Sequence, residues 1–341
     1  MSLPSLKKVE IQLTTACNMS CGFCFANAGR NVTLPAELAK NVITQLAKPE
    51  NGDAQEKSLW LTGGEALLSD SCKSLIEIAH GFGLKTGVAT NGLLLARKAA
   101  ALKAAGLQEV RVSLDAIKSS LFDQIRGTQK ALPKVLAGLE AASKSGLRTG
   151  IRFTATKNNA SELEPVIRQA QSIGAHHVEV KAVLPIGRAG ASIMLPPVDL
   201  NNLMKAALSL SSPKMPVTVL CSYLSPCHGF ELGKNHIPCI CGTEALYVAV
   251  SGKIMPCSYF PQTSAINIRS HTLREAWESN DFARIREERP YKCKTCETWE
   301  PCRNGCPALL AHYSDYQTSC FGQVETLRRN KSYGNDVCIK G

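Results

Sequence analysis

The sequence predicts an α/β protein whose core is a parallel sheet. Six short runs rich in β-branched residues alternate with segments of helical periodicity, which is typical of repeated βα units. The runs are Val9–Leu13, Leu59–Thr62, Thr86–Thr90, Val110–Leu114, Gly150–Thr156 and His177–Val183. They end near residue 190, whereas a closed barrel needs eight units over about 250 residues. We therefore expect an open, partial (β/α)6 TIM-like barrel, followed by a cysteine-rich C-terminal subdomain.

Start and stop signals support the helices between these runs. One helix is expected to begin near Pro35 and to stop before Pro49. The segment Ser161–Glu164 has the form of a capping box, and Gly174 closes the helix that follows. Because such helices separate successive parallel strands, the active site is expected at the carboxyl ends of the strands, where the βα loops converge.

Composition narrows the class of protein. The chain has 341 residues, of which 44% are hydrophobic and 15 are cysteines. We find no secretion signal and no run of about 18 apolar residues, so we expect a cytoplasmic protein that does not span a membrane. In a reducing compartment, clustered cysteines favour metal ligation over disulfides. The formal charge of +11 suggests an anionic partner, although thiolate-bound iron would offset part of that charge.

The first predicted strand leads directly into a loop that carries Cys17, Cys21 and Cys24. No further His, Cys, Asp or Glu occurs from Phe25 to Leu34. A closed structural zinc site would need a fourth such ligand nearby. A metal held by this loop therefore keeps one coordination position open, where an exogenous ligand can bind and react.

The spacing Cys-x3-Cys-x2-Cys, with Phe23 just before the last cysteine, resembles the signature of the radical S-adenosylmethionine (SAM) enzymes. In that family three thiolates hold a [4Fe-4S] cluster whose unique iron chelates S-adenosyl-L-methionine. The resemblance implies that the reduced cluster cleaves the sulfonium and that the resulting 5′-deoxyadenosyl radical abstracts a substrate hydrogen. The alternative from these residues alone is a zinc-binding loop or an incidental cysteine cluster.

Motifs at later strand ends extend this resemblance over residues 9 to about 190. The tripeptide after the second strand looks like the family's Gly-Gly-Glu motif, in which the glutamate accepts from the methionyl ammonium. The resemblance implies a cofactor site formed by Phe23, Gly63, Gly64, Glu65, Asn91, Ser113 and Arg126. For Arg126 the alternative is a solvated arginine at a helix end. The segment Gly187–Ala189 looks like a Gly-Arg-Ala sequence common in one branch of the family.

A second cysteine-rich region begins at residue 239, and its thiols outnumber the four that one tetrahedral metal site takes. Its spacing resembles the SPASM domain, which holds two auxiliary [4Fe-4S] clusters. The resemblance implies an outer cluster on Cys293, Cys296, Cys302 and Cys320, and an inner cluster on Cys241, Cys257 and Cys306. Zinc knuckles are the alternative, because soft thiolates satisfy zinc equally well.

The fourth ligand of the inner cluster stays open at this point. Cys239 is the first choice, Cys227 is the alternative, and a three-ligand cluster that binds substrate is the third possibility. Domain boundaries follow from these motifs. We expect the barrel at 1–190, a proline-rich bridging region at 191–238, the SPASM domain at 239–325 and a C-terminal tail at 326–341.

Three residues are candidates for catalysis. Cys221 and Cys227 are spare thiols that could donate a hydrogen atom, as in resembling epimerases, or could simply be packed or idle. Sulfatase-maturing relatives carry an aspartate base immediately after the cysteine matched by Cys257, where this chain has Ser258. Oxidation by that route is therefore in doubt, and Tyr259 is the candidate substitute.

The first functional hypothesis is a radical SAM/SPASM oxidoreductase that cross-links, epimerises or oxidises a peptide or protein side chain. The second is the same chemistry on a small molecule such as a sugar or aminoglycoside. The third is a zinc-knuckle protein that binds nucleic acid, which the low aromatic content of 6% disfavours. The first implies an electron donor such as flavodoxin or ferredoxin. Since only about eight residues precede the first strand, a peptide substrate would need a separate recognition protein or a short-range site.

Overall fold

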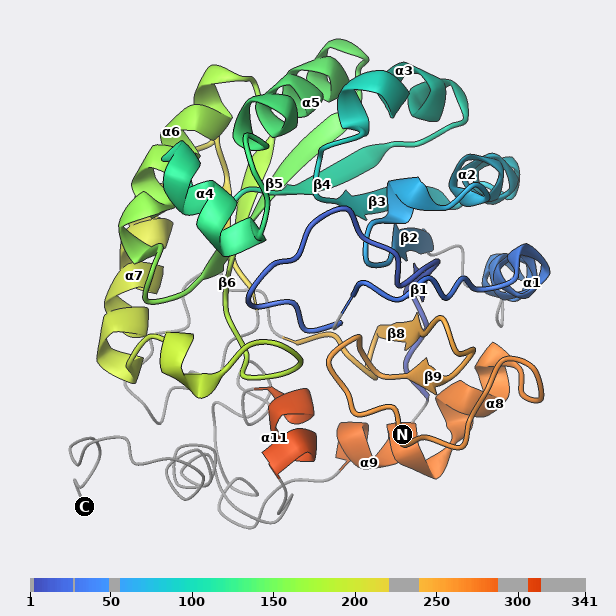
Figure 1. Cartoon of the computed structure of the whole chain (residues 1–341). Coiled ribbons are helices and arrows are strands. Elements are labelled where there is room, and N and C mark those ends of the chain that lie inside the picture. The colour runs from blue at the N-terminus through green and yellow to red at the C-terminus, as the bar shows by residue number, and fades with distance from the viewer. Residues whose placement is uncertain (1–2, 27, 49–55, 221–238, 288–305, 314–341) are drawn as a thin grey trace, which may run out of the picture.

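The computed structural model describes residues 3–26, 28–48, 56–220, 239–287 and 306–313. Within these ranges one sheet runs through the molecule (Figure 1). Its strands are β1 Lys8–Gln12, β2 Ser58–Thr62, β3 Lys85–Thr90, β4 Glu109–Ser113, β5 Arg148–Ala155, β6 His177–Ala182, β7 Val217–Val219, β8 Ala245–Val248 and β9 Ile254–Met255. The six predicted strands are confirmed, with boundaries that move by no more than two residues.

The strand order is β7-β6-β5-β4-β3-β2-β1-β8-β9. Every neighbouring pair is parallel except the β8–β9 hairpin. Among the described strands, β7 and β9 stand at opposite ends of this order and are not paired with each other, so the sheet curves without closing. The predicted partial barrel is confirmed.

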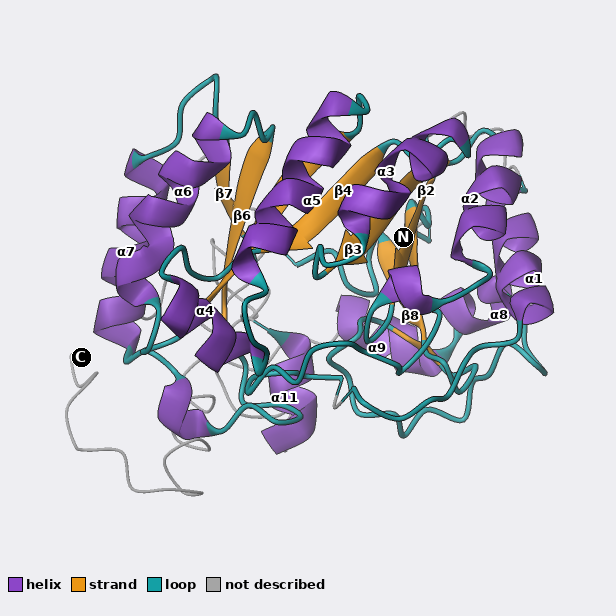
Figure 2. Ribbon diagram, turned by 45° about the horizontal axis from the view of Figure 1, so that its top comes forward, coloured by secondary structure: helices purple, strands orange, loops and turns teal. Residues whose placement is uncertain are grey.

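Helices cover the outer face of the curved sheet, while β8, β9 and the last helices lie beyond β1 (Figures 1 and 2). The α-helices are α1 Ala36–Ala47, α2 Cys72–Gly81, α3 Leu95–Ala104, α4 Ser119–Arg126, α5 Leu132–Lys144, α6 Leu163–Ser172, α7 Pro197–Ser209, α8 Leu273–Glu278, α9 Asn280–Glu287 and α11 Pro307–Tyr313. Short 3-10 turns are η1 Ala66–Leu68, η2 Ala160–Glu162 and η3 Ala191–Ile193. Among the described helices, none is both long and apolar enough to cross a bilayer.

The predicted capping box at the start of α6 is wrong. Ser161 lies in η2, and α6 begins at Leu163 without a side-chain cap. The Glu162 carboxylate instead accepts hydrogen bonds from the backbone amides of Ile117 and Lys118, at 2.7 and 3.0 Å. A tertiary contact with the loop after β4 therefore takes the place of the local cap. The other helix signals hold, since α1 follows Pro35 and a left-handed Gly174 follows α6.

Two regions join the sheet that the sequence did not assign to it. The expected bridging region contains α7 and β7, and β7 pairs in parallel with β6. The C-terminal region forms the β8–β9 hairpin, and strand β8 also pairs in parallel with β1. Both sides of β1 are thus covered, because β2 flanks it on the other side.

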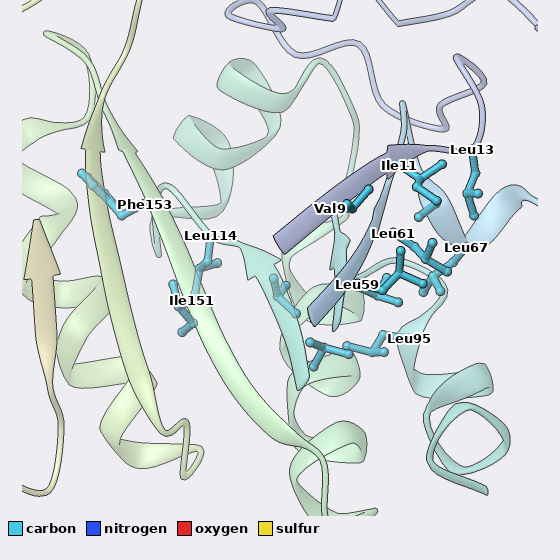
Figure 3. Packing of buried hydrophobic residues seen from close by; sticks show 14 of the residues in the cluster. Val9, Ile11, Leu13, Leu59, Leu61, Leu67, Leu95, Leu114, Ile151 and Phe153 are labelled. Atoms are coloured by element: carbon cyan, nitrogen blue, oxygen red, sulfur yellow. The ribbon is translucent and has the colours of Figure 1, made fainter. Parts of the chain in front are cut away.

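The hydrophobic core lies between the outer face of the sheet and the helices. Alternate strand residues point to this face and are almost completely buried, as Figure 3 shows for Val9, Ile11 and Phe153. The apolar faces of the helices supply the other half, with Val42 of α1 and Val135 of α5 at 0% exposure. Burial of this apolar surface is the dominant stabilising contribution to the fold.

The inner face of the same sheet is polar. The intervening strand positions are paired in register across the sheet and place their side chains in the concave lumen. They include Glu10, Gln12, Trp60, Thr62, Arg111, Ser113, Arg152, Thr154, Glu179 and Lys181. A closed eight-stranded barrel fills this space with bulky branched side chains. Here the open sheet leaves a lumen suited to a polar ligand.

Candidate functional site

The loop with Cys17, Cys21 and Cys24 lies across the carboxyl ends of the strands and is held there by close backbone contacts. A Cβ atom at Gly64, which follows β2, would lie 2.3 Å from the Ala16 carbonyl oxygen. A Cβ atom at Gly187, which follows β6, would lie 2.4 Å from the Cys24 carbonyl oxygen. Glycine is thus required where two other βα loops meet the cysteine loop.

Hydrogen bonds fix the same loop. Arg188 donates from Nε to the Cys21 carbonyl at 2.9 Å and from Nη1 to the Ala28 carbonyl at 2.7 Å. The Ser20 amide donates to the Arg126 carbonyl at 3.1 Å. The Gly-Arg-Ala segment noted in the sequence therefore clamps the cysteine loop, with Gly187 giving room and Arg188 giving hydrogen bonds.

All three cysteines line one cavity at the mouth of the lumen. The predicted cofactor residues Phe23, Gly63, Gly64, Asn91, Ser113 and Arg126 line it with them. Asn91 Nδ2 lies 3.9 Å from Cys17 Sγ, and Arg126 Nη1 lies 3.6 Å from Cys21 Sγ. Burial, together with the negative charges of Glu65 and the other two cysteines, raises the pKa of Cys17. Positive charge at this site would stabilise the Cys17 thiolate and so oppose the rise in its pKa.

Arg126, at the end of α4, is buried with 6% exposure, so its interpretation as a solvated arginine is wrong. Its Nη2 pairs with Asp115, whose other oxygen accepts from the Thr154 amide at 2.6 Å. Its Cζ lies 5.3 Å from the centroid of the Phe23 ring. Its Nε is buried without a hydrogen-bond partner among the described residues.

Glu65 was expected to bind the cofactor directly, but it is not among the residues that line the cavity. Its side chain is buried at 1% exposure, and its carboxylate accepts from Thr90 Oγ1 and the Asn91 amide, both at 2.7 Å, and from the Leu67 amide at 3.0 Å. Burial raises the pKa of Glu65, while these hydrogen bonds oppose the rise. Glu65 therefore ties the loop after β2 to the loop after β3. Its contact with a ligand ammonium stays a prediction.

The cysteine loop fits a thiolate-bound cluster better than a single ion. In the described part of the chain, no three His, Cys, Asp or Glu side chains are grouped in a way that could hold one metal ion. A four-iron cluster binds each thiolate to a different iron, so its cysteines surround a larger volume than those of a tetrahedral zinc. Cys17, Cys21 and Cys24 line a common cavity without being grouped closely enough for one ion, which is the arrangement that a cluster would need.

The second cysteine region is only partly described. Cys241 is hydrogen-bonded to the side chains of Cys239 and Cys257, and these contacts, with burial, raise the pKa of Cys241 well above its ordinary value. Cys306 is buried just before α11. The structure therefore brings together Cys239, Cys241 and Cys257 of the predicted inner site. Its other predicted ligands and thiols, Cys221, Cys227, Cys293, Cys296, Cys302 and Cys320, lie outside the described residues.

Tyr259, two residues after Cys257, reaches from the C-terminal region into the cavity that the three cysteines line. Its hydroxyl contacts Lys181 Nζ of β6, and its ring centroid lies 4.4 Å from that of Phe25. Ser258 lines the same cavity. This position is compatible with a catalytic role for Tyr259, and that role stays a prediction.

A set of charged lumen residues escaped the sequence analysis. Arg111, Arg152 and Lys181 come from three neighbouring strands and line the cavity, with Glu179 pairing to both arginines. The signal was the alternation of charged and apolar residues within β4, β5 and β6. Parallel strands that are covered on both faces read as near-continuous apolar runs, so this alternation indicated a polar lumen.

Two family models match the chain. Residues 11–170 match the radical SAM superfamily, and residues 239–298 match the SPASM iron–sulfur cluster-binding domain. Among curated relatives, the AdoMet-dependent heme synthase of Methanosarcina barkeri is 29% identical, over 89% of this chain and 92% of that protein. The PqqA peptide cyclase of Gluconobacter oxydans is 24% identical, over 94% and 92%.

Other comparisons agree on the fold. A probable GTP 3′,8-cyclase of Sulfurisphaera tokodaii is 35% identical, but over only 54% of this chain and 58% of that protein. The crystal structure of Streptococcus suis SuiB bound to S-adenosylmethionine superposes with a TM-score of 0.72 at 17% identity, covering 91% of this chain and 75% of that one. The fold of this chain is thus one that a solved protein shares over most of its length.

Proposed function

The chain belongs to the radical SAM superfamily and carries a C-terminal SPASM domain, and on that premise we propose that it modifies a side chain of a peptide or protein. The chain is a radical SAM enzyme that uses S-adenosylmethionine, a [4Fe-4S] cluster and auxiliary iron–sulfur binding in the SPASM domain. The proposed substrate is a peptide or protein side chain. The proposed reaction is cross-linking, epimerisation or oxidation.

When bound, the cluster and S-adenosylmethionine supply a 5′-deoxyadenosyl radical that takes a hydrogen atom from the substrate. The residues of this chain would hold the cluster and orient the groups around it. Cys17, Cys21 and Cys24 would hold the cluster, while Asn91 and Arg126 stabilise their thiolates from two sides. The ion pair with the buried Asp115 fixes the position of the Arg126 side chain in the wall of the cavity.

The observation that carries the proposal is the continuity between the cysteine cavity and the C-terminal region through Tyr259 and Ser258. A substrate in the lumen would contact both, because Tyr259 is fixed against Lys181 and Phe25. The described strands do not close into a barrel, and an open side of the sheet would admit a bulky chain to the lumen. A relative that is named a peptide cyclase is similar over nearly its whole length.

A second candidate substrate is a tetrapyrrole, because the relative named a heme synthase is also similar over nearly its whole length. A sugar or an aminoglycoside is the remaining small-molecule alternative.

Replacing Cys17, Cys21 and Cys24 together by alanine tests the cofactor site. The variant should lose iron equivalent to one cluster and should form no 5′-deoxyadenosine from S-adenosylmethionine with a reductant such as dithionite or flavodoxin, while auxiliary iron remains. Cys72→Ala is the matched control, since Cys72 is a thiol in the core at 2% exposure. Retained 5′-deoxyadenosine formation in the triple variant would contradict the assignment.

Oxygen-free incubation of the wild-type enzyme with peptides encoded by neighbouring genes tests the substrate. Mass spectrometry should show a loss of two hydrogens for a cross-link or oxidation, and deuterium uptake from solvent for an epimerisation. Haem-precursor porphyrins and sugars serve as parallel substrates. Turnover of a porphyrin or a sugar with no change in any peptide would reject the proposed peptide substrate. A requirement for flavodoxin or ferredoxin would be tested in the same incubations.

A further inference from the structure

The lumen wall contains an arginine whose orientation is fixed by three strands. Trp60 of β2 lies against β3 at Gly87, where a Cβ atom would come within 2.5 Å of the indole ring. Arg111 of β4 stacks on this indole, with its Cζ 3.7 Å from the ring centroid. Such stacking suits the planar guanidinium and restricts its rotation.

Carboxylates hold the other edge of the Arg111 guanidinium. Its Nε lies 3.0 Å from Glu109 Oε1 and 3.2 Å from Glu179 Oε1. Glu179 also pairs with Arg152 of β5, whose Nη2 and Nε lie 2.7 and 3.1 Å from Oε2. Although burial disfavours the charged form, Arg152 and Arg111 hold the pKa of Glu179 at about 2. Glu179 is therefore an anion that positions both arginines.

This arrangement leaves donors on both arginines for a ligand. The contacts to protein use Nε of Arg111 and Nε and Nη2 of Arg152. Among the described residues, neither Nη atom of Arg111 nor Nη1 of Arg152 has a hydrogen-bond partner, and none of these atoms is fully buried. Both side chains line the cavity, at 17% and 25% exposure. Their terminal nitrogens are thus accessible from the lumen.

A further cation lies beside the two arginines, whose own charges are partly compensated by Glu109 and Glu179. Lys181 adds a third cation on the next strand of the cavity wall. Of the described residues that line the cavity, Glu10 alone is acidic, and it pairs with Lys8 at 2.6 Å. Burial opposes ionisation of Glu10, but Lys8, Arg152 and Arg111 lower its pKa, so it serves as an internal counter-ion.

We propose that Arg111 and Arg152 form a carboxylate-binding subsite in the lumen, and that the substrate is a peptide with an acidic side chain beside the residue that reacts. A carboxylate accepts two parallel hydrogen bonds from the terminal edge of a guanidinium, and the stacked Arg111 presents such an edge. The choice of an acidic peptide rests on the proposed peptide substrate. The carboxylate subsite itself is argued only from the lumen residues.

Binding without turnover tests the subsite. The full-length, cluster-loaded enzyme is dialysed to equilibrium, without oxygen or reductant, against radiolabelled N-acetylglutamic acid α-amide, its glutamine counterpart and its phosphoserine counterpart. We expect the glutamic acid probe to bind at least tenfold more tightly than the glutamine probe, since only the former is charged. Equal binding of these two would overturn the subsite, and tighter binding of the phosphoserine probe would overturn its assignment to a carboxylate.

Two variants assign the binding to these arginines. Arg111→Lys keeps the charge but loses the planar pair of donors, and it should reduce the preference for the acidic probe by about fivefold. The double variant Arg152→Gln with Glu179→Gln removes one cation and one anion together, so it leaves no unpaired buried carboxylate, and it should also reduce the preference. A preference retained in both variants would overturn the proposal.

A surface arginine provides the matched control. Arg168 of α6 is 72% exposed and pairs with Glu164, so Arg168→Gln should leave the preference unchanged. Formation of 5′-deoxyadenosine is measured on the same preparations. If the probes fail to discriminate while 5′-deoxyadenosine forms and peptides are modified, the subsite falls and the proposed function stands. If the acidic probe is preferred but no peptide is modified, the proposed function falls and the subsite stands.

Discussion

The two faces of the sheet are built from the same strands but from opposite kinds of residue. On the outer face, Val9, Ile151 and Phe153 are 0% exposed and pack against helices. On the inner face, Glu10 and Arg152 alternate with them and line a cavity. Because side chains alternate along a strand, each strand contributes to stability with one set of residues and to the site with the other.

This separation has a physical consequence for substitutions. Changes on the outer face should alter the free energy of unfolding and leave binding per folded molecule intact. Changes on the inner face should alter binding, and they affect stability only through the buried charge pairs. Three substitutions test how far this division holds.

The largest effect on stability is expected on the outer face. Phe153→Ala removes a completely buried ring from β5 and should lower the free energy of unfolding by about 3–5 kcal/mol. Denaturant titration measures this change. Phe82→Ala is the matched control, because Phe82 is 51% exposed and should contribute little. The acidic-probe preference of the folded Phe153 variant should equal that of the wild type, and a loss would show that the faces are coupled.

Glu179→Gln tests the inner face. It should lower the free energy of unfolding by about 2 kcal/mol, a smaller effect, because both arginine partners are partly hydrated. The pKa of Glu179 is lowered to about 2, so its contribution is complete above about pH 4.5 and is lost as the pH falls toward 2. The variant should therefore show a weaker loss of stability between these pH values. A pH dependence identical to that of the wild type would exclude a structural ion pair. Glu164→Gln, at an exposed pair, is the control.

Gly87→Ala probes the stack of Trp60 and Arg111. The added methyl would lie 2.5 Å from the indole, so the ring must move, at a cost of about 1–3 kcal/mol. Tryptophan fluorescence and the acidic-probe preference should both change. Gly81→Ala in α2 is the control, because a Cβ atom there meets nothing within 4 Å. An unchanged fluorescence spectrum in Gly87→Ala would indicate that Trp60 does not lie where the structure places it.

Much of this arrangement could be predicted from local sequence. The strands β1 to β6 follow from β-branched runs, and the cysteine loop follows from its spacing. The buried place of Glu65 could not be predicted, because it depends on Thr90 and the Asn91 amide, which approach only when β2 and β3 pair. The wrong capping box at Ser161 has a similar cause, since a contact with the loop after β4 outcompetes the local pattern.

The lumen charges were available in the sequence but were not recognised. Arg111 and Arg152 stand at alternate positions of short strands, and so few residues per strand give only a weak signal of a polar inner face. The pairing of β8 with β1 was beyond local reasoning, because it joins segments separated by more than 230 residues, as the contact between Lys7 and Glu244 illustrates. Neither strand carries a local signal for such a partner.

The position of β8 beside β1 has a consequence for dissecting this protein. A fragment that stops before residue 239 would retain the first three cysteines but would expose the whole backbone edge of β1 to solvent. A strand with an uncovered edge can pair with strands of other chains, which leads to aggregation. The loop with Cys17, Cys21 and Cys24, which follows β1 directly, would then lose its rigid support. The parts before and after residue 239 should therefore be expressed as one polypeptide, because the C-terminal part completes the sheet of the N-terminal part.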